Sequence, residues 1–211
     1  MNKDSSGYPG NLFVIAAPSG AGKTSLVSAL IKKERKMVHS ISYTTRPMRP
    51  KEQQGINYNF ISVDEFTQMI ADNLFLEWAQ VFQHYYGTSS QSIEKQLQES
   101  LDIILEIDWQ GAAQIKKLFP ESISIFILPP SREVLRNRLN ARKQDEQAVI
   151  DHRMSKASSE IKHYQDFDYL IINDDFNEAL HHLSLIVQAS HLRQAEQAAQ
   201  YKQLLAELLK K

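Results

Sequence analysis

A buried strand that leads directly into a glycine-containing octapeptide is the feature that most constrains how this chain folds. Residues 12–17 (LFVIAA) are continuously apolar, as expected of a strand covered on both faces of a parallel sheet. Residues 17–24 (APSGAGKT) follow at once, and residues 25–33 have a helical pattern. Glycine permits a sharp strand-to-helix turn whose backbone N–H groups converge on an anion. The segment therefore predicts an α/β fold with a phosphate-binding loop.

The octapeptide departs from the usual phosphate-binding pattern at its first position, where Ala17 stands in place of glycine. We expect Lys23 to reach the β- and γ-phosphates of a nucleotide, and the Thr24 hydroxyl to coordinate Mg²⁺. The alternative is an ordinary strand–helix turn with an incidental lysine, which the flanking strand and helix disfavour. The predicted phosphate-binding residues are Ala17, Pro18, Ser19, Gly20, Ala21, Gly22, Lys23 and Thr24.

Beyond this loop the chain alternates apolar runs with helical patterns. Three further apolar runs are predicted strands, at residues 102–107, 122–128 and 169–172. Helices are expected over residues 112–118 and 131–139, and from the polar cap at 173–175 towards residue 191. Strands separated by helices form βαβ units in a parallel sheet that is covered on both faces. The predicted fold class is a three-layer α/β P-loop NTPase fold with a parallel core sheet.

Two segments depart from this alternation. Residues 40–90 are rich in aromatic side chains, and Ser62 with Glu65 forms a capping-box pattern that starts a helix. We interpret these residues as a small α+β insert on the main sheet. Residues 189–211 are rich in alanine, glutamine, leucine and lysine, with apolar positions at helical spacing. This C-terminal helix either packs on its own domain or forms a contact in a homo-oligomer, and the sequence leaves both open.

The composition narrows the classes of partner. Lysine and arginine number 24 and aspartate and glutamate 25, so the net charge is −1 and no nucleic-acid partner is indicated. No run approaches the roughly 18 apolar residues of a membrane span, so no membrane partner is expected. Residues 1–10 lack the apolar core of a signal peptide. Without cysteine the chain has no disulfide and no thiolate metal site, and we expect a cytoplasmic location.

Acidic and basic side chains near the predicted loop are candidates for metal and phosphate binding. The run at 103–108 ends in carboxylates, of which Asp108 is the better placed for a magnesium site, with Glu106 on the same face. Arg46 and Arg49 lie in a proline-stiffened loop and suit a bidentate grip on phosphate. An ordinary basic turn is the alternative. A second arginine cluster follows residue 131: Arg132, Arg136, Arg138, Arg142 and Arg153.

Seven short motifs, in this order, resemble the guanylate kinase family. They lie at residues 17–24, 42–49, 55–60, 75–79, 85–88, 106–111 and 172–175. The resemblance covers about residues 10–188. It implies an enzyme that transfers the γ-phosphoryl group of Mg·ATP to GMP, giving ADP and GDP. ATP is then the donor, Mg²⁺ the cofactor, and the two nucleotides the partners.

The resemblance also implies a division of the chain and a moving part. The core would comprise residues 10–39, 91–130 and 161–188, with a GMP-binding insert at 40–90 and a helical lid at 131–160. Closing a lid over the transferred group excludes water.

The lid would carry Arg142 and Arg153, whose charges stabilise the transferred group. Relatives commonly have glycine where Ala141 and Lys143 flank Arg142, so the flexibility of the lid is in question. For Arg132 and Arg136 we prefer a solvated helix face.

Residue by residue, the resemblance implies the following roles. Glu77 would accept the N1–H and N2–H groups of guanine, with hydroxyls at Ser42 and Thr88 near the base. The expected GMP-binding residues are Ser42, Arg46, Arg49, Tyr58, Glu77, Tyr86, Thr88 and Asp108. Arg138 and Asn173 would join the loop in binding ATP. The expected catalytic residues are Lys23, Arg46, Arg142 and Arg153, and the expected metal ligands are Thr24 and Asp108.

Two other functions compete with this one. A guanylate-kinase-like interaction module would keep the fold without catalysis, but such modules typically lose the loop lysine or the lid arginines. A related P-loop kinase could use another acceptor, such as a phosphorylated ribose, although Glu77 with Ser42 and Thr88 favours guanine. The seven histidines are interpreted as surface or packing residues.

Overall fold

The main sheet of the protein has five parallel strands. The computed structural model describes residues 10–81, 83–141 and 147–210. The strands are β1 (Leu12–Ala16), β2 (Met37–His39), β7 (Asp102–Glu106), β8 (Ile123–Leu128) and β9 (Tyr169–Ile172), in the order β2-β7-β1-β8-β9. Every neighbouring pair is parallel. β1 lies at the centre with all five residues buried, which explains its continuously apolar sequence.

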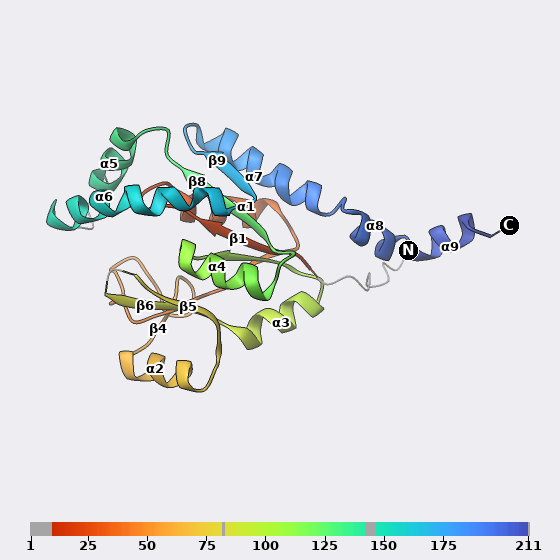
Figure 1. Cartoon of the computed structure of the whole chain (residues 1–211), viewed down its shortest axis with the longest axis horizontal. Coiled ribbons are helices and arrows are strands. Elements are labelled where there is room, and N and C mark those ends of the chain that lie inside the picture. The colour runs from red at the N-terminus through yellow and green to blue at the C-terminus, as the bar shows by residue number, and fades with distance from the viewer. Residues whose placement is uncertain (1–9, 82, 142–146, 211) are drawn as a thin grey trace.

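Helices cover both faces of this sheet (Figure 1). Because side chains alternate along β1, Phe13 and Ile15 pack on one face and Leu12 and Val14 on the other. The first face is covered by α1 (Lys23–Lys33) and α7 (Phe176–Ser190), and the second by α3 (Ser90–Gln98) and α4 (Trp109–Leu118). The predicted three-layer α/β fold with a parallel core is confirmed.

Two further parts lie at the same end of the main sheet (Figure 1). Residues between β2 and α3 form a second sheet, in the order β4-β3-β6-β5, with the helix α2 (Val63–Ala71). Its strands are β3 (Tyr43–Thr44), β4 (Asn59–Phe60), β5 (Phe75–Val81) and β6 (His84–Ser89). On the other side lie α5 (Arg132–Ala141), α6 (Gln147–Lys162) and the short 3₁₀ helix η1 (His163–Asp166). Arg142 and Lys143 lie outside the described residues.

The predicted helix starts are largely confirmed, with differences that have local causes. Ser62 and Glu65 form the expected capping box of α2. The Ser131 hydroxyl accepts a hydrogen bond from the backbone of Val134 at 3.1 Å, as an N-cap should. α4 begins at Trp109 rather than at residue 112, because the Asp108 carboxylate caps it. β2 was not predicted, since its three residues are too few to show a pattern.

The C-terminal segment forms two short helices instead of one. These are α8 (Gln194–Gln200) and α9 (Lys202–Leu208), separated at Tyr201, and α9 projects away from the body of the protein (Figure 1). None of the described helices is long and apolar enough to cross a membrane.

A buried polar network fastens α8 to the amino ends of the strands. The backbone N–H of Asn11 donates to Asp102 at 2.9 Å, and its side-chain amide donates to Glu196 at 2.8 Å. Nε2 of His191 lies 2.6 Å from the other oxygen of Asp102. The hydrogen bond to Asp102 raises the pKa of His191, although burial opposes it.

We predict that this contact stabilises the fold more in mild acid than in alkali. Because the folded-state pKa of His191 is raised above 6.5, its contribution is complete below pH 6.5 and is lost as the pH rises through the folded-state value. His191→Gln should therefore reduce the free energy of unfolding more at pH 6 than at pH 9. The difference should be at most about 1 kcal/mol, since the imidazole is partly exposed and screened by solvent.

Urea unfolding at the two pH values measures this difference. His181→Gln, an exposed histidine on α7, is the matched control and should show little change. Equal destabilisation by His191→Gln at both pH values would contradict the assignment.

Candidate active site

A large pocket opens between the carboxyl ends of the main strands, the second sheet and α6. Its volume is about 1200 Å³, which exceeds the usual size of a site for one small ligand. The P-loop lines one end, and side chains of the second sheet line the other. α6 contributes Arg153 and Glu160. One pocket therefore has room for two nucleotides side by side.

The loop between β1 and α1 has the geometry of a phosphate-binding turn. Gly20 and Gly22 both have φ of +96°, a conformation that residues with a side chain rarely adopt. A Cβ at Gly22 would lie 2.4 Å from the side-chain nitrogen of Asn173. The Lys23 ammonium donates to the carbonyl of Ile107 at 2.9 Å, at the mouth of the same pocket. The loop thus presents its backbone N–H groups and one cation to the pocket.

Asn173 and Arg138 brace this loop from outside the pocket. The Asn173 amide donates to the carbonyl of Ala21 at 2.7 Å, and one Arg138 nitrogen donates to the same carbonyl at 3.4 Å. The other terminal nitrogen of Arg138 donates to the carbonyl of Asn173 at 2.9 Å. Neither side chain lines the pocket. Both side chains therefore support the loop from behind, and their expected contact with ATP stays a prediction.

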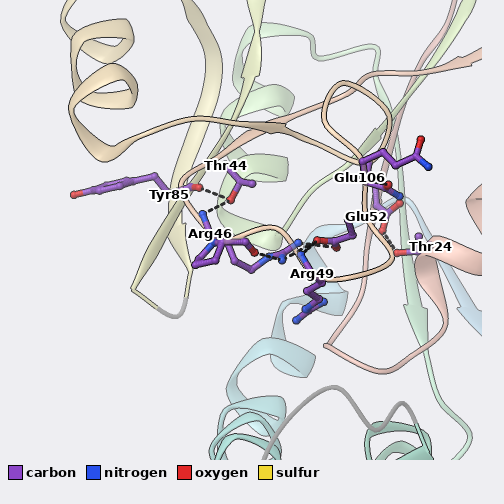
Figure 2. Close-up of polar contacts among 10 residues, drawn as sticks. Thr24, Thr44, Arg46, Arg49, Glu52, Tyr85 and Glu106 are labelled. Atoms are coloured by element: carbon purple, nitrogen blue, oxygen red, sulfur yellow. Dashed lines mark hydrogen bonds and ion pairs between the residues drawn. The ribbon is translucent and has the colours of Figure 1, made fainter.

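The acid next to Thr24 is Glu106 and not Asp108. The Thr24 hydroxyl donates to Glu106, which ends β7 (Figure 2). The two oxygens of Asp108 accept instead from the backbone of Gly111 at 2.9 Å and the side chain of Gln110 at 3.0 Å. Glu106 and Asp108 both line the pocket, but β7 ends at Glu106 and Asp108 is the N-cap of α4, so of the two Glu106 is the one that contacts Thr24. The metal-binding role expected of Asp108 stays a prediction.

Nε2 of His39 lies 3.8 Å from Glu106, and His39 lines the pocket. His39 therefore lies on the pocket wall beside a carboxylate, a placement that the sequence did not indicate. Burial lowers its pKa, and the nearby charge of Glu106 opposes that shift.

A buried carboxylate lies at the far end of the pocket. Glu77 is 3% exposed, and it faces Thr88 across the β5–β6 pair. The Thr88 hydroxyl donates to one oxygen of Glu77 at 2.6 Å. Burial raises the pKa of Glu77 to about 7, with the hydrogen bond from Thr88 opposing the shift and the charge of Asp108 adding to it. Ser42 and Glu77 are among the residues that line the pocket and Thr88 is not, but the hydrogen bond from Thr88 orients the carboxylate. The expected place of the Thr88 hydroxyl near the base stays a prediction.

Cationic and aromatic side chains lie between the two ends of the pocket. Arg46, Arg49, Tyr58 and Tyr86 all line it, as expected. The Arg46 guanidinium lies over the rings of Tyr58 and Phe60, at 5.5 and 5.6 Å from their centroids. It also pairs with Glu52, a residue that the sequence analysis missed (Figure 2). Its position six residues after Arg46 gives no periodic signal.

Helix α6 contacts the tip of the P-loop. Arg153 donates to the Ser19 hydroxyl at 3.0 Å. Glu160, also missed from the sequence, lines the pocket from the same helix, two turns further along. Burial raises the pKa of Glu160, while the Ser19 backbone N–H opposes the shift. Arg142, predicted as the second lid arginine, lies outside the described residues.

Comparison with known proteins decides the family. The family profile described as "Guanylate kinase" matches residues 9–190. The chain belongs to the guanylate kinase family. The guanylate kinase of Saccharophagus degradans is 54% identical over 200 residues, covering 95% of this chain and 98% of that protein. That of Pseudoalteromonas translucida is 51% identical over 201 residues, covering 95% and 98%.

A solved structure agrees with this membership. The crystal structure of guanylate kinase from Anaplasma phagocytophilum matches with a TM-score of 0.77 and 30% identity, covering 90% of each chain. Members of the guanylate kinase family phosphorylate GMP with ATP, giving GDP. The predicted family and activity are confirmed, so the interaction module and the different acceptor are dropped.

We predict that Asn173 supports the P-loop even when no nucleotide is bound. Asn173→Ala removes a buried hydrogen bond and leaves the Ala21 carbonyl poorly satisfied, so the free energy of unfolding should fall by about 1–2 kcal/mol. The KM for ATP should rise several-fold while the KM for GMP changes little. Urea unfolding of the nucleotide-free protein and initial rates measure the two effects.

Asp174→Ala, on the exposed neighbouring residue, is the matched control. If Asn173 acted only by touching ATP, its replacement would leave the stability of the nucleotide-free protein unchanged.

Proposed function

We propose that this single pocket carries out the family reaction, with ATP at the P-loop end and GMP at the end formed by the second sheet. The observation that carries the proposal is the pairing, in one pocket, of a phosphate-binding loop with a buried carboxylate at Glu77. A P-loop holds the donor in many enzymes, but a carboxylate at the other end suits a base with two adjacent donors. Guanine has such donors at N1 and N2.

At the donor end, the P-loop N–H groups and Lys23 bind the phosphates of ATP. The positive φ at Gly20 and Gly22 lets the backbone approach the phosphates closely. The ammonium of Lys23 already lies at the pocket, held by the carbonyl of Ile107. These groups are fixed before ATP arrives, so little reorganisation accompanies binding.

The donor set beside the P-loop fits Mg²⁺. The Thr24 hydroxyl and the Glu106 carboxylate are hard oxygen ligands in mutual contact. Mg²⁺ usually takes one or two protein ligands and completes its shell with water and phosphate. Among the described residues no cluster of three or more histidine, cysteine or acidic side chains forms a protein cage. When bound, the ion would neutralise charge on the phosphate oxygens.

At the acceptor end, Glu77 accepts the N1–H and N2–H groups of guanine. Thr88 occupies one lone pair of the Glu77 carboxylate and fixes its orientation. Ser42 lies at the same wall of the pocket, where its hydroxyl suits a contact with the base. Asp108 lies close enough for its charge to raise the pKa of Glu77, and we retain it in the GMP site. A base that left these buried polar groups unpaired would be rejected strongly.

Between the two ends, Arg46, Arg49, Tyr58 and Tyr86 hold the phosphate of GMP in line with the γ-phosphorus of ATP. An oxygen of this phosphate attacks the γ-phosphorus, the bond to the β-phosphate oxygen breaks, and ADP leaves. Arg153 reaches the same region from α6 and stabilises the transferred charge. No covalent enzyme intermediate is needed, since positioning and charge carry the catalysis. Arg142 stays a prediction for the same role.

We also propose the division of the chain expected from its sequence. Residues 10–39, 91–130 and 161–188 form the core, residues 40–90 bind GMP, and residues 131–160 close as the lid. The cytoplasmic location expected from the sequence stays a prediction.

We predict that GMP binds more weakly in mild acid because Glu77 must be ionised to accept two donors. With the pKa of Glu77 at about 7, most of the carboxyl groups are protonated at pH 6 and most are ionised at pH 8. The Kd for GMP should be about tenfold higher at pH 6 than at pH 8 from this group alone. Titration calorimetry at the two pH values measures the ratio.

Glu77→Gln is the control for this effect. It should bind GMP more weakly at pH 8, and it should lose the part of the pH dependence that Glu77 causes, while titration of the GMP phosphate affects both proteins equally. An identical pH ratio in the two proteins would refute the role of Glu77.

We further propose that the C-terminal segment mediates self-association. α9 has no buried residue, and its leucines Leu204, Leu205 and Leu208 are exposed, as is Leu209 directly after the helix. A helix of seven residues is too short to persist alone in water. A second copy of the same helix would cover the leucines and stabilise both.

We predict that Leu204→Glu with Leu208→Glu yields a monomer, whereas the unchanged protein has the mass of a dimer or larger assembly. Light scattering after gel filtration measures the mass. Gln200→Glu with Gln203→Glu adds the same charge at polar positions and should leave the assembly intact. A monomeric unchanged protein at working concentration would refute self-association.

A further inference from the structure

Glu52 is the most heavily hydrogen-bonded acid near the proposed phosphate site. It lies in the loop between β3 and β4 and lines the pocket. Its two oxygens accept from both terminal nitrogens of Arg46, at 2.8 and 3.0 Å. One of these oxygens also accepts from the backbone N–H of Arg49 at 2.8 Å. The backbone N–H of Glu52 in turn donates to the carbonyl of Arg49 at 3.0 Å.

This arrangement fixes the guanidinium of Arg46 and the backbone of Arg49. Three of the five N–H groups of Arg46 point to Glu52 and to the carbonyl of Pro47, which lies 2.7 Å from Nη1 (Figure 2). The guanidinium also lies over the rings of Tyr58 and Phe60, which restrict its movement. Glu52 and Pro47 leave Nε and the outer N–H of Nη2, and Tyr86, another residue of the proposed phosphate site, also interacts with the guanidinium.

Glu52 could act on the incoming phosphate in two opposite ways. As a stand-in anion, it would occupy Arg46 until GMP displaced it, and it would weaken GMP binding. As a support, it would stay in place and aim Arg46 at the phosphate, and it would strengthen GMP binding. The structure favours the second role, because the Glu52 carboxylate also accepts from the backbone N–H of Arg49, and a backbone hydrogen bond between the same two residues holds Glu52 beside Arg49. Displacing the carboxylate would break three hydrogen bonds at once.

We propose that Glu52 is a positioning residue that remains paired with Arg46 and sets the orientation in which Arg46 and Arg49 grip the phosphate of GMP. The inference rests on the proposed placement of GMP at the second sheet. The pair is only slightly exposed, with 12% of the Arg46 side chain and 16% of the Glu52 side chain accessible. The paired charges cancel, so Glu52 adds no attraction for the phosphate. Its contribution is to fix the orientation of the Arg46 guanidinium.

The direction in which the KM for GMP changes in Glu52→Gln separates the two roles. Glu52→Gln keeps the shape but removes one negative charge, so the phosphate site gains a net positive charge. A purely electrostatic effect, or the loss of a competing anion, would lower the KM for GMP. Loss of positioning would raise it, because Arg46 is no longer held at both nitrogens.

Initial rates of Glu52→Gln, Glu52→Asp, Arg46→Lys and the double variant Arg46→Lys with Glu52→Gln test the proposal. We expect the KM for GMP to rise at least tenfold in Glu52→Gln and less in Glu52→Asp, while the KM for ATP stays within twofold. Because Glu52 acts through Arg46, the double variant should be little worse than Arg46→Lys alone. Glu94→Gln, on the exposed face of α3, is the matched control and should have unchanged kinetics.

A lower KM for GMP in Glu52→Gln would overturn the proposal, as would an equal rise in the KM values of both substrates. Full additivity of the two substitutions would also overturn it. Glu52→Asp keeps the charge, so the comparison remains possible if Glu52→Gln folds poorly. Failure of the proposed function is distinguishable, since the unchanged protein would then form no ADP that depends on GMP.

Discussion

The turn between β1 and α1 is the constraint on which the rest of the structure depends. Gly20 and Gly22 adopt a backbone conformation that side chains disfavour, and there is no room for side chains there in any case. A Cβ at Gly20 would meet Leu139 of α5, and one at Gly22 would meet Asn173 after β9. The turn, α5 and the end of the sheet therefore fit together as one unit. Because Asn173 and Arg138 both hold the carbonyl of Ala21, the loop keeps its shape without a nucleotide.

Three carboxylates of the pocket each have a hydrogen-bond partner. Glu106 accepts from Thr24 beside the P-loop, Glu77 accepts from Thr88 at the far end, and Glu52 holds Arg46 between them. A carboxylate near two nucleotides would otherwise repel their phosphates or turn away from the base. Fixed partners give each acid one direction, which is the preorganisation that phosphoryl transfer requires.

The sequence predicted the structure correctly where a feature depends only on neighbouring residues. The apolar run of β1, the glycines of the loop and the Ser62–Glu65 capping box depend on neighbouring residues only, and all three are found as expected. Which of Glu106 and Asp108 contacts Thr24 depends on where β7 ends. The predicted strand ended one residue too late, at residue 107 instead of 106.

The pairing of Glu52 with Arg46 and the hydrogen bond from Thr88 to Glu77 could not be predicted, because each contact depends on how the chain folds beyond its neighbouring residues. Glu77 and Thr88 are brought together only by the pairing of β5 with β6. His39 likewise faces Glu106 only because β2 pairs with β7. The resemblance to a family identified Glu77 and Thr88 but not Glu52 or His39, and the contacts of all four come from the structure.

The proposed function depends most on one pocket that joins ATP at the P-loop to GMP at Glu77. The most direct test measures ADP formation from Mg·ATP with GMP, AMP, CMP, UMP and dTMP supplied separately. We predict rapid ADP formation with GMP and little with the other four. Comparable rates with AMP or a pyrimidine nucleotide, or no ADP with any acceptor from a folded protein that binds ATP, would contradict it.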